Sequence, residues 1–425
     1  MVQIKRGQQD SQSGFKATGA QRGADYLWNM IGSMCYSLSS FYYLMLVTRI
    51  CGVMEGGVFA LAFATAQLLL TLGRYGMRTY QATDTERTYA FGEYARTRIF
   101  TCLGMVVLSL PYCLVMGYDL SRILIFFFVA GLKMLDAVED VFHGELQRSD
   151  RVARMGQMLA ARNIFSCIVF GVAIVVTRKL LFTVVATDVL SLAFCLLING
   201  WAVRTWCPRD KRFAQEHLRE LFVICFPIFI STFLSLFLYN IPKYAIDLYL
   251  TEDYQTYYSI LFMPSFVITL FSEIVTRPVL TSIAIAWNED LAKFKAIIRR
   301  NFLLIAAATV GVVIGGHFVG RWLLELIYGV DLSPYKLDFV ILLIGGGLSA
   351  SVYVTYNILI SIRAQRYIIM GYLATAAVAV PLTYIVVGKT GMFGASVAYL
   401  LTCLVLQIAF GATLIAQVRQ RTAHD

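Results

Sequence analysis

Apolar residues form runs of about twenty positions along most of the chain, separated by short polar segments. A run of this length crosses the roughly 30 Å hydrocarbon core of a bilayer as an α-helix. Because no water is available there, each run must form its backbone hydrogen bonds within its own helix. Transmembrane strands would be shorter and would alternate in hydrophobicity. The pattern predicts about twelve membrane-spanning helices, at residues 26–48, 56–76, 97–117, 121–142, 159–177, 180–202, 219–240, 254–276, 302–325, 337–361, 366–388 and 391–416.

The composition agrees with this pattern. Of the 425 residues, 58% are hydrophobic and only 15% are charged. A soluble domain has about a quarter of its residues charged, because its surface faces water. The nine cysteines are scattered and form no CxxC pair, so we expect neither a disulfide framework nor a metal site. The polar N-terminal residues do not resemble a cleaved signal peptide.

The positions of Lys and Arg predict the orientation, because basic loops remain on the cytoplasmic side. With both termini inside, 27 of the 36 Lys and Arg residues lie on the cytoplasmic side and 8 lie in outer loops. This split predicts an even number of spans and two cytoplasmic termini. It also accounts for the net charge of +10, so we expect no nucleic-acid partner.

A polar stretch at 204–220 divides the chain into two sets of six predicted spans. A shift of 198 residues places Glu55 and Phe59 on Asp253 and Tyr257, at the start of the second span of each half. We therefore predict an all-α integral membrane protein with two six-helix bundles, related by a pseudo-two-fold axis along the membrane normal. The expected parts are a basic cytoplasmic segment at 1–24, bundles at 25–203 and 219–416, a cytoplasmic linker at 204–218 and a cytoplasmic tail at 417–425.

Polar side chains recur at helical spacing from the second predicted span onward. Gln67, Thr71, Arg74, Arg78 and Gln81 share one face at 100° per residue. An arginine in a cavity presents a planar fork suited to phosphate or carboxylate, which makes these residues candidates for substrate binding. In the alternative interpretation, Arg74 and Arg78 anchor the cytoplasmic end of the helix.

Three further spans carry stripes of hydroxyl groups. Their members include Ser33, Ser37, Thr232, Ser235, Tyr239 and Thr269. Ser and Thr often join neighbouring membrane helices by hydrogen bonds, which is the alternative for any single residue. Four stripes on duplicated helices favour a shared hydrophilic cavity between the two halves.

The predicted span at 121–142 carries the most charge. Lys133, Asp136, Glu139, Asp140 and His143 lie on one arc of the helix. Ionised groups within a bilayer must be paired or face water. Lys133 and Asp136 are spaced to pair, and the neighbouring Asp136 and Asp140 carboxylates suit a site that couples H⁺ or Na⁺ to transport. Alternatively, the helix leaves the membrane near Glu139, and its end is solvated.

The chain contains no P-loop, no GxSxG motif and no HExxH motif. We therefore expect no enzymatic activity and no bound cofactor. Any active transport would draw on ion gradients, on the membrane potential or on consumption of the substrate elsewhere.

Four segments carry a resemblance to a known family. They are TRICG at 48–52, GVFALA at 57–62, YGMRTYQATD at 75–84 and NIPKYAI at 240–246. Their pattern, with the number of spans, resembles bacterial polysaccharide transporters of the multidrug/oligosaccharidyl-lipid/polysaccharide superfamily, which include O-antigen and teichoic-acid precursor flippases. The resemblance implies two six-helix bundles around a cationic cavity in the bacterial cytoplasmic membrane.

The implied substrate is an oligosaccharide joined through pyrophosphate to undecaprenol, which moves from the cytoplasmic to the outer leaflet. By position, Arg49, Arg78, Gln81 and Lys243 match recurring residues of the family. Lys133 is a further candidate for substrate binding, because it lies on the charged face of the predicted span at 121–142. The expected partners are the lipid-linked oligosaccharide and the bilayer, and a polysaccharide polymerase or glycosyltransferases are further candidates.

Two alternatives remain. A cation-coupled multidrug exporter of the related branch usually carries a carboxylate within its first span, and residues 26–48 contain none. A membrane-embedded glycan-assembly protein with catalytic activity would need long outer loops, and the predicted outer loops are short.

Overall fold

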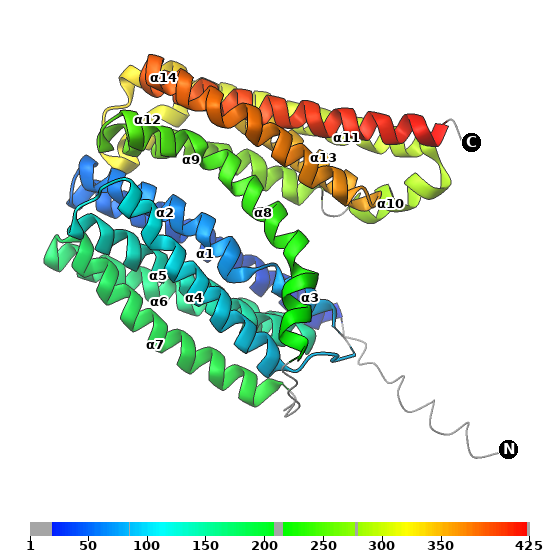
Figure 1. Cartoon of the computed structure of the whole chain (residues 1–425), viewed down its shortest axis with the longest axis horizontal. Helices are drawn as coiled ribbons and strands as arrows, with labels where there is room; N and C mark the ends of the chain where they lie inside the picture. The colour runs from blue at the N-terminus through cyan, green and yellow to red at the C-terminus, as the bar shows by residue number, and fades with distance from the viewer. Residues whose placement is uncertain (1–18, 85, 208–215, 277–278, 423–425) are drawn as a thin grey trace.

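The structure, a computed structural model, describes residues 19–84, 86–207, 216–276 and 279–422. Within these ranges the chain forms helices and short connections and no strand. Most of the predicted segment at 1–24, most of the linker at 204–218 and the last residues of the predicted tail lie outside the described residues. Figure 1 shows long helices that run side by side in two groups.

Helices occupy the positions of all twelve predicted spans. In the first half they are α1 (Gly19–Ile50), α2 (Val53–Arg74), α3 (Met77–Thr83), α4 (Phe91–Val115), α5 (Leu120–Arg148), α6 (Val152–Thr177) and α7 (Leu180–Trp206). In the second half they are α8 (Glu216–Tyr249), α9 (Glu252–Thr276), α10 (Leu280–Glu289), α11 (Leu291–Gly315), α12 (Arg321–Tyr328), α13 (Lys336–Ser361) and α14 (Gln365–Thr422). One π-helical turn, η2 (Gly316–Gly320), joins α11 to α12, and a 3₁₀ turn, η3 (Ser333–Tyr335), precedes α13.

Backbone breaks explain how the predicted spans map onto these helices. The last two predicted spans are the two arms of α14, which is interrupted at Gly391 by a non-helical backbone with φ of 65°. A glycine tolerates this conformation because it has no Cβ. Short helices, α3 and α10, follow the second span of each half. This match of helix order between the halves agrees with the predicted duplication.

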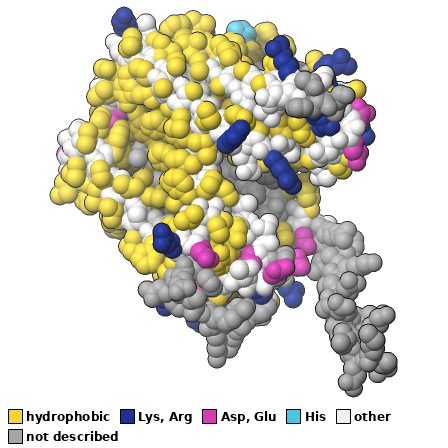
Figure 2. Space-filling view, turned by 45° about the vertical axis from the view of Figure 1, so that its right-hand side comes forward, with side chains coloured by type: hydrophobic (Ala, Val, Ile, Leu, Met, Phe, Trp, Pro, Cys, Tyr) yellow, Lys and Arg dark blue, Asp and Glu magenta, His cyan; other side chains and the backbone are white. Residues whose placement is uncertain are grey.

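Apolar side chains cover much of the outer surface. Leu103, Val107 and Leu114 on α4, and Val172 and Val176 on α6, are each more than half exposed. Exposed apolar surface of this extent is what lipid covers in a membrane protein. By length and composition, nine helical stretches of the described chain can cross a membrane. Figure 2 shows apolar side chains over much of this face and charged side chains gathered toward one end.

The two groups of helices meet at one end of the molecule and diverge toward the other (Figure 1). We call the first the closed end; it carries the α1–α2 and α8–α9 turns. The Thr256 hydroxyl donates a hydrogen bond across it to the Val53 carbonyl at 2.6 Å. The other, which carries α3 and α10, we call the open end.

Polar contacts join the halves at the closed end. Arg122 forms an ion pair with Glu252, and Arg49 donates hydrogen bonds to the carbonyls of Leu326 and Ile327. A second set of contacts involves one carboxylate. Asp247 of the second half accepts hydrogen bonds from Tyr112, at 2.7 Å, and from Tyr118 of the first half. These bonds give the closed end a specific geometry that depends on both halves.

We expect Gly57→Ala to weaken the contact between the halves. A Cβ at Gly57 would overlap the Glu252 carbonyl oxygen, so α2 and α9 must move apart. Hydrogen–deuterium exchange of the purified protein should become faster at 50–60 and 250–260. Gly92→Ala is the matched control, because nothing lies within 4 Å of a Cβ at that position. Unchanged exchange in Gly57→Ala would contradict the expectation.

Helix α8 contacts both halves. Near its start, Phe229 stacks on Tyr75 of the first half with ring centroids 4.8 Å apart, and Glu220 accepts a hydrogen bond from Tyr89 at 3.1 Å. Later turns of α8 pack against α14 and α9 of the second half. Helix α8, which begins the second half, therefore packs against the first half as well.

Candidate functional site

The charged face of α5 is buried in the first half. Lys133, Asp136, Glu139 and Asp140 are each at most 7% exposed. The Lys133 ammonium lies 3.0 Å from Asp136, and Arg162 on α6 lies 2.6 Å from Asp136 and 2.9 Å from Glu139. Glu139 is thus an internal ion-pair partner, and the solvated helix end that was one interpretation of this segment does not occur there.

Asp140 is surrounded by three guanidinium groups. Arg98 on α4 lies 2.9 Å from Oδ2, whereas Arg78 and Arg74 lie 3.6 Å and 3.9 Å from Oδ1. Arg98 also donates to the Gly73 carbonyl, and its side chain is 3% exposed. The buried arginine therefore makes the close ion pair with Asp140, and the other two make long contacts with its second oxygen.

This network has more cations than carboxylates. Five cationic side chains, Arg74, Arg78, Arg98, Lys133 and Arg162, meet three carboxylates, Asp136, Glu139 and Asp140. The excess positive charge lies at Arg74 and Arg78, whose side chains are 37% and 33% exposed. The Nε atom of Arg74 is buried and has no hydrogen-bond partner among the described residues. We call these two residues the cationic pair.

Further contacts hold the cationic pair in place. The Arg74 guanidinium lies 5.7 Å from the centre of the Tyr36 ring, and the Lys133 ammonium lies 5.0 Å from the same centre. A cation over an aromatic face is stabilised by the ring quadrupole. Arg78 contacts Gln147 Oε1 at 3.4 Å and the sulfur of Met155 at 3.0 Å. Both guanidinium groups are therefore positioned while part of each remains exposed.

The predicted stripe from Gln67 to Gln81 does not continue along one helix. Helix α2 ends at Arg74, and Tyr75 and Gly76 adopt left-handed backbone angles before α3 begins. Gln81 is consequently turned toward α5, where it is buried and donates to the Val141 carbonyl at 3.2 Å. This is a packing contact within the first half.

The remaining candidates on α2 and α8 lie in different surroundings. Thr71 is buried and donates to the Leu68 carbonyl of its own helix at 2.7 Å, and Gln67 is partly buried on α2. Lys243 is partly buried on α8, with its ammonium 5.4 Å from the centre of the Phe262 ring. Arg49 lies at the closed end. The structure thus brings Arg74, Arg78, Lys133, Asp136 and Asp140 together and places Arg49 outside this network.

Neither Arg98 nor Arg162 was among the predicted site residues. Both are internal partners of the α5 carboxylates. A signal existed for Arg162, because it falls inside the predicted span at 159–177, where an arginine must be paired or face water. Arg98 lies at the start of the predicted span at 97–117, where a basic residue usually indicates only the cytoplasmic boundary.

A second charged cluster fixes the loop between α3 and α4. Asp84 accepts hydrogen bonds from the backbone N–H groups of Thr88 and Tyr89 at 2.8 and 3.1 Å, and lies 3.2 Å from Arg148. Burial by itself raises the pKa of the Asp84 carboxyl, but these hydrogen bonds outweigh it, so that pKa is lowered. Glu145 pairs with Arg148 at 2.5 Å and with Arg87 at 3.0 Å.

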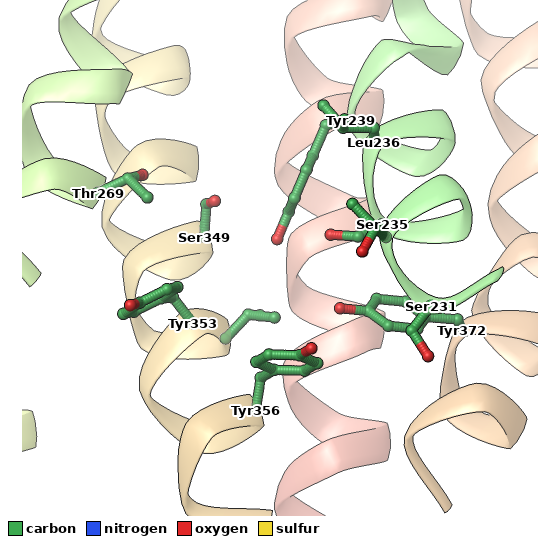
Figure 3. Close-up of a pocket in the computed structure, with 11 residues that line it drawn as sticks. Ser231, Ser235, Leu236, Tyr239, Thr269, Ser349, Tyr353, Tyr356 and Tyr372 are labelled. Atoms are coloured by element: carbon green, nitrogen blue, oxygen red, sulfur yellow. The ribbon is translucent and has the colours of Figure 1, made fainter. Parts of the chain in front are cut away.

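The second half contains a pocket of a different character. It has a volume of about 220 Å³ and lies between α8, α9, α13 and α14. Nine of its eleven lining residues carry a hydroxyl group, and none is charged. Figure 3 draws the lining residues and labels Ser231, Ser235, Tyr239, Thr269, Ser349, Tyr353, Tyr356 and Tyr372 among those with a hydroxyl group. We call it the hydroxyl pocket; it contains Thr232, Ser235, Tyr239 and Thr269 from the predicted stripes.

Solved structures with the same fold are known. An inward-facing multidrug resistance MATE family transporter of the MOP superfamily superposes with a TM-score of 0.72 at 14% identity, covering 91% of this chain and 95% of that one. The lipid II flippase MurJ in an inward closed conformation gives 0.68 at 13% identity, covering 91% and 87%. An outward-facing MATE family transporter gives 0.52 at 14% identity, covering 93% and 94%. The inward-facing and inward closed structures therefore superpose on this chain better than the outward-facing one.

Sequence comparison identifies the family. The chain has no significant match among curated protein sequences. A family model described as "Polysaccharide biosynthesis protein" matches residues 23–284, which is more than half of the chain. With the shared fold, this confirms the resemblance stated from the four sequence segments. The chain belongs to the polysaccharide biosynthesis protein family, and it has the fold of the MATE family and MurJ structures.

Proposed function

We propose that this chain flips an undecaprenyl-pyrophosphate-linked oligosaccharide, a precursor of cell-surface polysaccharide, across the bacterial cytoplasmic membrane by alternating access. The observation that carries the proposal is the cationic pair: two partly exposed guanidinium groups share one oxygen of Asp140, whose other oxygen is bound by Arg98. Membership of the polysaccharide biosynthesis family supports a glycan precursor as the substrate.

The charge of the site suits a pyrophosphate group. Moving an ionised group through hydrocarbon without hydrogen bonds is prohibitively costly, so the headgroup needs replacements for its water shell. A guanidinium group supplies several N–H donors in a fixed plane that matches phosphate oxygens. Arg74 and Arg78 have N–H groups available for phosphate oxygens, because their contacts with Asp140 are long. The undecaprenyl chain can meanwhile remain in the lipid.

We propose that the membrane potential sets the direction of transport. An inside-negative potential favours outward movement of an anion by about 2.3 kcal/mol per charge per 100 mV. We propose that both termini lie in the cytoplasm, as the Lys and Arg distribution predicts, so that the open end faces the compartment where the precursor is made. Coupling of H⁺ or Na⁺ at Asp136 or Asp140 would require a cation to replace one of the guanidinium or ammonium partners.

One observation favours the flippase over a cation-coupled exporter. Residues 26–50 of α1 contain no carboxylate, and the nearby Asp25 accepts a hydrogen bond from the Ala153 backbone N–H at 2.8 Å. Asp25 thereby satisfies a free N–H at the start of α6, which is a structural role. The three carboxylates of the charged network, Asp136, Glu139 and Asp140, are paired with arginine and lysine.

The proposal is tested by deleting the gene in its host and extracting the lipids. We expect undecaprenyl-pyrophosphate-linked oligosaccharide to accumulate on the cytoplasmic side and to disappear when the wild-type gene is restored. Leaflet location is measured by access of a membrane-impermeant glycosidase in oriented vesicles. Absence of any accumulated lipid-linked glycan would overturn the proposed substrate.

A further inference from the structure

The hydroxyl pocket lies outside the charged network and has no part in the proposed recognition of pyrophosphate. Its lining comes from α8, α9, α13 and α14 of the second half, whereas the cationic pair lies on α2 and α3 of the first. It contains no charged side chain, so it provides no opposite charge to neutralise an ionic ligand. Its hydroxyl groups therefore favour a polar ligand without net charge.

The pocket offers both donors and acceptors of hydrogen bonds. The Ser231 and Thr232 hydroxyls donate to the carbonyls of Pro227 and Ile228 at 2.8 Å, which leaves their oxygens as acceptors. In Figure 3 the hydroxyl groups of Tyr239, Ser349 and Tyr372 point into the space between α8, α13 and α14. Such groups can rotate to donate or to accept. The complementary ligand therefore carries several hydroxyl groups of its own.

The volume of the pocket and its tyrosine rings further limit the kind of ligand that fits. Pockets for drug-sized ligands measure about 300–1,000 Å³. A volume of about 220 Å³ instead suits one ring-sized unit of a longer molecule. Four tyrosines contribute apolar ring faces beside their hydroxyl groups. A pyranose has the same division into apolar C–H faces and polar hydroxyl edges.

We propose that the hydroxyl pocket binds one neutral sugar unit of the lipid-linked oligosaccharide. This inference rests on the proposed function and adds a second subsite to it. The first half holds the anionic linkage through the cationic pair, and the second half holds the glycan. A substrate that engages both halves interacts differently with the inward-facing and outward-facing arrangements, which is the condition for a ligand to shift a conformational equilibrium.

The test measures the binding of two lipids by the purified full chain in lipid nanodiscs. One probe is the lipid-linked oligosaccharide extracted from the deletion host, and the other is undecaprenyl pyrophosphate, which has no sugar. Wild-type protein should bind the glycosylated lipid more tightly. Tyr239→Phe and Tyr372→Phe should each weaken that binding about 3- to 10-fold, since each removes one hydroxyl group, and should leave the Kd for undecaprenyl pyrophosphate unchanged. Tyr249→Phe, on an exposed residue of α8, is the matched control.

The outcomes separate this inference from the proposed function. Equal affinity of the wild type for the two lipids, or variants that bind both lipids less tightly to the same degree, would overturn the sugar subsite and leave the flippase proposal intact. Failure of the wild type to bind either lipid would overturn the flippase proposal itself. A thermal unfolding measurement checks that each variant is folded. We expect both to be folded, because a Tyr→Phe change preserves the ring.

Discussion

Transport of the lipid-linked glycan is expected to fall by about tenfold to a hundredfold when Arg74 is replaced by glutamine, the range given by the loss of one hydrogen bond to a charged group. Arg74 is one of the two partly exposed cations, and its Nε atom lacks a hydrogen-bond partner within the described residues. The substitution removes the charge but keeps a polar side chain of similar length. Flipping is measured in proteoliposomes, and surface glycan is measured in cells at matched protein levels.

Two further variants make this result interpretable. Arg74→Lys should recover part of the activity, because an ammonium group supplies the charge without the planar fork. Arg299→Gln, at an exposed arginine of α11, is the control for loss of one positive charge. Normal surface glycan in Arg74→Gln at wild-type protein levels would show that this arginine has no role in transport.

The second large effect concerns stability. Replacing Arg162 with methionine should destabilise the protein by about 3–5 kcal/mol, the usual cost of removing one partner of a buried ion pair. Arg162 is 4% exposed and pairs with both Asp136 and Glu139, so its loss leaves buried negative charge with fewer partners. The free energy of unfolding is measured in detergent micelles by denaturant titration.

Rescue distinguishes this mechanism from a simple packing defect. Adding Glu139→Gln to Arg162→Met removes one of the stranded charges and should recover part of the lost stability. Arg154→Met on the same helix is the control, because Arg154 is exposed and contacts Gln157 and the Trp206 ring, 4.8 Å from its guanidinium, in place of a buried carboxylate. Its unfolding free energy should change by about 1 kcal/mol or less. Equal losses in both single variants would contradict the ion-pair explanation.

The sequence was sufficient for the number of spans and for the charged face of α5. Both follow from local patterns: apolar runs long enough to cross a bilayer, and polar residues recurring at helical spacing. Lys133 and Asp136 pair within one helix, so their contact was also accessible. The expectation that these charges are paired or face water needed only the cost of placing them in lipid.

The partners from other helices were not accessible in the same way. Arg98 is 42 residues from Asp140, and Arg162 is 26 residues from Asp136, so each pair depends on how the helices pack. The stripe through Gln81 assumed an unbroken helix, and the left-handed turn at Tyr75 and Gly76 moved that residue to a different face. Helical spacing carries no information across such a break.

The packing of α8 against both halves has a mechanical consequence. If the halves rotate relative to one another, α8 cannot follow both as a rigid rod, because its first turns contact Tyr75 and its later turns contact α14. Pro227 and Pro242 both lie within α8, and neither provides a backbone N–H for the preceding turn, so resistance to bending is reduced at these two positions. Opening of one face and closing of the other would then be linked through flexure of a single helix.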